Sequence, residues 1–423
     1  MRQLSSRRLS IWGAALAVVV AWPRDLRAGA SAPSAVFACV AEPDPGADLA
    51  RTFREAVLGY RPPADKVAEA ILKDAMRFVA PEANRVLRPH GDVLRRHVIW
   101  ALARLPRERL PDMTKWEHLP VRWLNEKDRA EMEAELSMRD FALVMLRDPA
   151  HAFALIQSLS IIHDEATGTR LIREASLDGI APPRLVWAND DVERPVLAIV
   201  KRREICEVDF AYDAASLSYL PQRIVWAKRP SLAAPSAAVV GDPGATALRA
   251  FTDVVQSYDV DGSKDGPSQF VVNANAFAMA QAPRLLGDAA AALRARARCE
   301  LARRPLQALP DTRSWRVVHH GEPPNTMPTG KLVALPLLKW DPARFFTTIR
   351  DTTRFAVESG STGWRAVLDR AAPPVVVRTT DDLDGPTLAI IDRDEVFTVS
   401  FRYDPSIPGY APVDINWLRR PVP

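Results

Sequence analysis

The feature that most constrains this chain is an internal duplication within its 423 residues. Residues 181–230 align with residues 372–421 at a constant offset of 191 without a gap, and 22 of the 50 aligned positions are identical. Solenoid repeats recur every 20–50 residues or so, and a repeat of this length therefore indicates tandem domains. A fold or a site in one copy is then expected at matched positions in the other.

The similarity extends upstream through short motifs whose offset shifts by a few residues. The motif Asp-Pro-Gly-Ala occurs at residues 44–47 and 242–245, Leu-Pro-Asp followed by Trp at 110–116 and 309–315, and Asp-Pro-Ala at 148–150 and 341–343. We therefore predict copy one over residues 36–230 and copy two over residues 241–423. The small residues between them are typical of a linker.

Residues 1–30 have the pattern of a bacterial signal peptide. Arg2, Arg7 and Arg8 precede an apolar stretch over residues 11–22, and Ala-Gly-Ala at 28–30 offers a cleavage site. The stretch is shorter than the roughly 20 residues of a membrane-spanning helix, and no later segment reaches that length without charges. We expect a periplasmic or secreted protein with no transmembrane span after signal removal. A buried N-terminal helix is the alternative.

The net charge argues against a nucleic-acid partner. Residues 1–30 carry five arginines and one aspartate, a net of +4, and the whole chain is also +4. The chain without this segment is thus close to neutral. A protein that binds phosphate backbones needs a surplus of Lys and Arg, and none remains.

Each copy begins with helical patterning. The aspartates at 44 and 242 are placed as N-caps, each followed by a proline at the first helical position. Leu49, Phe53 and Val57 fall on one face of the helix that follows. The aspartates at 148 and 341, also followed by proline, are expected to open a further helix.

The second half of each copy has the alternation of β-strands. Val208, Phe210 and Tyr212 alternate with polar or small residues, as do the matched positions 399, 401 and 403. Residues 197–200 precede this strand across a short turn, which predicts an antiparallel hairpin, and residues 224–226 supply a further strand. The predicted fold class is α+β, with two tandem homologous copies of N-terminal helices followed by an antiparallel sheet.

The duplication also tests candidate chemistry. None of the seven histidines has a histidine counterpart in the other copy, so a histidine-based site common to both is not expected. The aspartates at 190–191 and 381–382 are matched, but Asp commonly bonds its own backbone in turns. The matched Glu204 and Glu395, with Arg202 and Arg393, are interpreted as a solvated hairpin turn. The three cysteines show no metal spacing and no disulfide framework, and we expect buried thiols.

Two weak sites remain from the sequence. Matched aromatic residues, with a pair of matched arginines, suit a protein or glycan ligand, although core packing is the simpler explanation. These candidate ligand-binding residues are Tyr219, Trp226, Tyr410, Trp417, Arg202 and Arg393. A calcium ion is the only cofactor hinted at, by the alternating acids Asp259, Asp261 and Asp265, and a plain turn is the alternative.

The sequence therefore favours an exported tandem-repeat protein that acts as a non-catalytic binding or scaffolding module. We expect the copies to pack about a pseudo-twofold axis, with a ligand surface between them. The alternative is a secreted hydrolase with one active and one degenerate copy, in which His151, His163 and Asp164 would converge. No nucleophile elbow, P-loop or dinucleotide motif is present in the chain.

Overall fold

A computed structural model places most of the two copies. It describes residues 44–62, 68–119, 150, 153, 177–178, 180–215, 218–231, 233, 242–258, 267–321, 338–358, 365, 368–369, 371–406 and 408–421. Residues 1–43, which hold the predicted signal peptide, lie outside this set.

In both copies the described elements include three α-helices, then one strand and later a run of four strands; η2 is described in copy one only, and η4 and α12 in copy two only. The elements of copy one are α1 (Ala47–Val57), α2 (Ala68–Val86), η2 (Arg88–His90), α3 (Gly91–Ala103), β1 (Glu117–Leu119), β2 (Arg184–Trp187), β3 (Val196–Val200), β4 (Glu204–Asp213) and β5 (Ser218–Lys228). Those of copy two are α8 (Pro243–Gln256), α9 (Pro267–Leu286), α10 (Ala290–Ala302), β6 (Arg316–Gly321), η4 (Leu338–Trp340), α12 (Pro342–Glu358), β7 (Val377–Arg378), β8 (Thr387–Ile391), β9 (Glu395–Asp404) and β10 (Gly409–Arg419).

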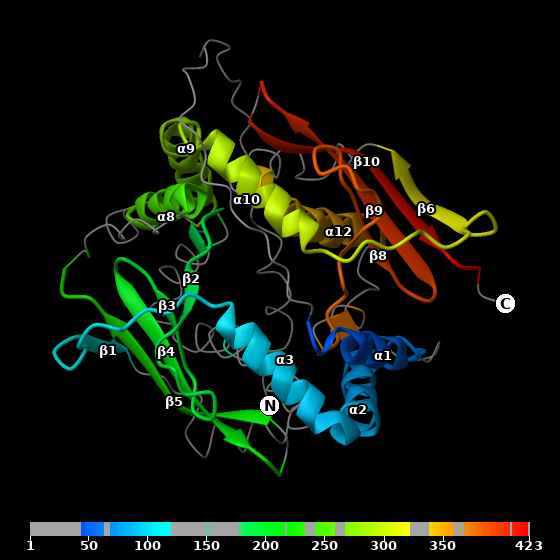
Figure 1. Cartoon of the computed structure of the whole chain (residues 1–423), viewed down its shortest axis with the longest axis horizontal. Helices are drawn as coiled ribbons and strands as arrows, with labels where there is room; N and C mark the ends of the chain where they lie inside the picture. The colour runs from blue at the N-terminus through cyan, green and yellow to red at the C-terminus, as the bar shows by residue number, and fades with distance from the viewer. Residues whose placement is uncertain are drawn as a thin grey trace, which may run out of the picture.

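Each copy carries one five-stranded antiparallel sheet, and the two sheets have the same topology (Figure 1). The strand orders are β1-β5-β4-β3-β2 and β6-β10-β9-β8-β7. The predicted hairpin is present, because β3 pairs with β4 from Val196 opposite Asp209 to Val200 opposite Ile205. The predicted α+β class, with helices before each sheet, is confirmed.

The aspartate before the first helix of each copy contacts backbone N–H groups at the start of that helix, and it also contacts a side chain of α3 or α10. In copy two Asp242 caps α8 by accepting from the Ala245 N–H at 2.7 Å, and its other oxygen accepts from Arg296 of α10. In copy one the helix begins later, with Gly46 as its N-cap, and Asp44 accepts from the Gly46 N–H and contacts His97 of α3. The N-cap prediction is therefore right for Asp242 and inexact for position 44.

The first two helices of each copy pack against the other copy. Helices α1 and α2 share a buried cluster with Leu368, Ala371 and Ala372 of copy two. Helices α8 and α9 share one with Leu177, Ile180 and Ala181 of copy one, which are the matched positions at an offset of 191. In Figure 1, α8 and α9 accordingly lie beside the first sheet, and α1 and α2 below the second. These two helix clusters are thus shared between the copies, in the reciprocal manner of a two-fold interface.

The remaining helices cover their own sheets. Val98 and Leu102 of α3 belong to the cluster beneath β3, β4 and β5, and Ala297 and Leu301 of α10 belong to the equivalent cluster of copy two. The other face of each sheet is covered by the Leu-Pro-Asp…Trp segment. There Arg229 stacks on Trp116 at 4.8 Å, as Arg420 stacks on Trp315 at 5.0 Å.

The cysteine prediction is half right. Cys206 is a free, buried thiol, and burial raises its pKa to about 12. Cys299, in contrast, is disulfide-bonded, with a partner outside the described residues. Spacing along the sequence gave no sign of this bond. Among the described helices, none is both long and apolar enough to cross a membrane.

Candidate functional site

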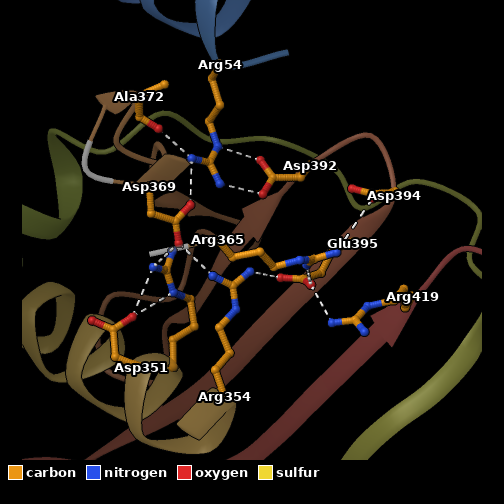
Figure 2. Close-up of polar contacts among 11 residues, drawn as sticks. Arg54, Asp351, Arg354, Arg365, Asp369, Ala372, Asp392, Asp394, Glu395 and Arg419 are labelled. Carbon is orange, nitrogen blue, oxygen red and sulfur yellow. Dashed lines mark hydrogen bonds and ion pairs between the residues drawn. The ribbon is translucent and has the colours of Figure 1, made fainter. Parts of the chain in front are cut away.

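The densest group of charged side chains lies where α1 of copy one meets the sheet of copy two (Figure 2). Arg54 on α1 binds Asp392 through two parallel hydrogen bonds of 2.7 and 2.6 Å. Its third nitrogen donates to Asp369 at 3.0 Å and to the carbonyl of Ala372 at 2.5 Å. Arg54 is only 4% exposed, so this fork of hydrogen bonds satisfies a buried guanidinium.

Glu395, at the start of β9, is the most deeply buried acid of the cluster, at 1% exposure. Its carboxylate accepts from Arg365 at 2.6 Å, from Arg419 at 3.2 Å and from Arg354. Arg354 also donates to Asp369 at 2.6 Å and thereby joins this acid to the Arg54 contacts. The cluster is therefore one continuous network across the two copies.

The protonation states of the network are fixed by its charges. Burial by itself would raise the pKa of Glu395, but Arg354, Arg365 and Arg419 outweigh it and lower the pKa to about 2. Burial also opposes ionisation of Asp369, and the charges of Arg350, Arg54 and Arg354 still lower its pKa. A general acid or base needs a pKa near the working pH. Carboxylates that several guanidiniums keep ionised are instead suited to stabilising the folded structure.

Copy one has a smaller network at the matched positions. Lys201 binds Asp178 at 2.8 Å and Glu204 at 3.3 Å. Gln256 of α8 donates to Asp178 at 2.9 Å and to the carbonyl of Ala181 at 3.1 Å. Each copy thus offers one aspartate and one carbonyl to a helix of the other copy.

The interpretation of Glu204 and Glu395 as a solvated hairpin turn is wrong. Both side chains are buried, at 2% and 1% exposure. The sequence conceals this because the partners of Glu395 come from positions 354, 365 and 419, which no local spacing brings together. Identity of the glutamate in both copies was the available signal, since a solvated turn has no need of one.

The predicted aromatic residues lie in the cores. Tyr219 and Tyr410 are at most 2% exposed, and their hydroxyls donate to the carbonyls of Val192 and Leu383 at 2.9 and 2.8 Å. Trp226 and Trp417 are buried too, and their indole N–H groups have no hydrogen-bond partner within the described part of the chain. This burial favours the core-packing explanation, and a ligand role for the four side chains stays a prediction.

The other predicted residues are dispersed. Arg202 donates twice to the carbonyl of Ala233, while Arg393 lies exposed in the turn before β9. The predicted turns are confirmed: Asp191 and Asp382 each accept from backbone N–H groups two residues on. Asp259, Asp261 and Asp265 lie outside the described residues, as do His151, His163 and Asp164. Over the ranges that are described, no three acids, histidines or cysteines are grouped as metal ligands.

A second matched arrangement is more exposed, and sequence comparison alone did not single it out. In copy two Arg294 of α10 lies 4.1 Å from the ring centre of Tyr403 and binds Asp384 at 2.9 Å. In copy one Arg95 of α3 lies 5.2 Å from the ring centre of Tyr212 and binds Glu193. The arginines and acids are 39–49% exposed. We call these two groups the Arg–Tyr surfaces.

Comparison of the chain with protein-family models, with curated proteins and with solved structures gives no match in any of the three.

Proposed function

We propose that this chain is an exported, non-catalytic binding or scaffolding protein whose ligand contacts are the two Arg–Tyr surfaces. The observation that carries the proposal is the repetition of Arg, acid and Tyr at matched, solvent-accessible places. The other matched acids described above are engaged in turns, helix starts or the ionic network. What both copies retain on the surface is thus the best candidate for a shared role.

The chemistry of these surfaces suits a protein or glycan ligand. A tyrosine ring offers apolar area, and a guanidinium beside a carboxylate offers donors and acceptors for hydroxyl or amide groups. Two equivalent surfaces on one chain would also allow bivalent attachment, which strengthens weak individual contacts.

Export is supported by the disulfide at Cys299 together with the basic and apolar pattern of residues 1–30. Structural disulfides persist in oxidising compartments and are rare in reducing ones. We expect the purified native protein to start near Ser31. Thiol titration in denaturant should find one free thiol before reduction and three after it, because Cys206 is free and Cys299 is disulfide-bonded. Unprocessed protein with three free thiols would contradict export.

Binding is tested with residues 31–423 on arrays of glycans and of peptides. We expect binding that is reduced at least about tenfold in the double variant Arg95→Ala and Arg294→Ala. The control is Arg313→Ala, which removes an arginine whose side chain is 94% exposed and lies outside both surfaces. Equal binding by the double variant and the unaltered protein would remove the Arg–Tyr surfaces from consideration.

Two other outcomes would replace the proposal. Turnover of esters, peptides or glycans that is lost in His163→Ala would establish the hydrolase alternative. A melting temperature that falls when a chelator is added would point to calcium at Asp259, Asp261 and Asp265.

A further inference from the structure

The junctions between the copies are equivalent in shape but differ in charge. Position 392 in copy two is an aspartate, and the matched position in copy one is Lys201. Asp392 accepts hydrogen bonds from Nε and Nη2 of Arg54 on α1. Lys201 binds the acids of its own copy, and the helix residue that matches Arg54 is Thr252 of α8.

These differences suit only one of the conceivable pairings. If the hairpin of α1 and α2 lay on copy one, Arg54 would meet Lys201 in place of its paired carboxylate. If the hairpin of α8 and α9 lay on copy two, Thr252 would leave Asp392 without its guanidinium. Burying a charge that lacks its partner, or that faces a like charge, is strongly unfavourable.

We infer that the charge at position 392 makes the helical hairpin of α1 and α2 a binding surface for copy two specifically. Copy one therefore pairs with copy two, and neither copy pairs with another copy of its own kind. The apolar part of the junction does not make this distinction, since Phe53 and Val57 of α1 match Phe251 and Val255 of α8. The like-charge encounter in the wrong pairing supplies the discrimination.

The test uses the full chain with a protease recognition sequence placed within residues 234–241. After the disulfide is reduced and the chain is cut, the two halves are run on a size-exclusion column over a dilution series. We expect the unaltered halves to elute together. The variant Asp392→Lys should raise the concentration at which they separate by at least about 100-fold, and Asp392→Asn by less.

A matched control and a compensating variant complete the design. Asp381→Lys makes the same charge change on the same copy at a side chain that is 83% exposed, and it should leave the elution unchanged. Combining Asp392→Lys with Arg54→Thr places the residues of the other junction at these two positions, so that the new lysine can bind Asp369 of its own copy as Lys201 binds Asp178. We expect it to recover at least about tenfold of the lost association.

Several results would overturn the inference. One is separation of the unaltered halves at every concentration tested. Another is an Asp392→Lys variant whose halves separate at no higher a concentration than those of Asp381→Lys. The inference also fails if the compensating variant associates no better than Asp392→Lys alone. If Asp392→Lys does not yield folded protein, the single variant Asp392→Asn is compared with the double variant Asp392→Asn and Arg54→Thr. Equal association of the halves in these two variants would contradict the inference.

Discussion

Glu395 shows how a single buried carboxylate is stabilised in this molecule. Three guanidiniums, from α12, residue 365 and β10, converge on its two oxygens. Removing one partner from a buried ionic group costs about 3–5 kcal/mol, because the remaining charges stay desolvated and uncompensated. We therefore expect Glu395→Gln to lower the free energy of unfolding in urea by an amount in that range. Asp381→Asn, at an exposed acid, serves as the control and should change it little.

The same residue predicts a pH dependence. The pKa of Glu395 is lowered in the folded protein from an ordinary value of 4.5 to about 2. A lowered pKa in the folded state contributes stability above about pH 4.5, which is lost progressively as the pH falls towards 2. We expect the free energy of unfolding to decrease across this window, and to decrease less steeply in Glu395→Gln. Parallel curves for the two proteins would show that other groups control acid unfolding.

In each copy a tyrosine on the strand that comes last in the chain, β5 or β10, is hydrogen-bonded to the loop before β3 or β8. Tyr219 donates to Val192 and Tyr410 donates to Leu383. Losing such a hydrogen bond costs about 1 kcal/mol. We expect Tyr219→Phe and Tyr410→Phe each to show this loss in urea unfolding, and the double variant to show the sum, because the two loops belong to different sheets. The control is Tyr403→Phe, because the Tyr403 hydroxyl donates no hydrogen bond in the described structure. This substitution should leave the free energy of unfolding unchanged.

The strands were predictable because their signals are local. Alternation at Val208, Phe210 and Tyr212 specifies which face is buried, and the short turn after residue 200 specifies the hairpin. The packing of α1, α2, α8 and α9 against the other copy was not predictable from such signals. The apolar stripe with Phe53 and Val57 predicts that one face of α1 is buried, but it does not indicate which copy that face packs against. The burial of Glu395 was missed for the same reason, since its partners are distant in the sequence.

For the whole molecule, the shared cores imply that the two copies cannot unfold independently. Unfolding copy two removes Leu368, Ala371 and Ala372 from the core of α1 and α2. Unfolding copy one removes Leu177, Ile180 and Ala181 from the core of α8 and α9. A calorimetric scan should therefore show one transition whose calorimetric and van't Hoff enthalpies agree. Two resolved transitions would mean that each copy is stable alone.

The coupling is tested more directly by a substitution in one copy that is measured in the other. Leu368 is 1% exposed and packs beneath the helices of copy one, so Leu368→Ala should cost about 2–5 kcal/mol. We expect hydrogen exchange to report this loss in α1, although α1 precedes the altered residue by some 310 positions. Val413→Ala, on the same copy and 42% exposed, is the control and should leave α1 protected. If Leu368→Ala weakened only copy two, the reciprocal packing would not be what holds the copies together. Exchange that rises in α1 and in the sheet of copy two alike would instead make the duplicated chain one cooperative unit.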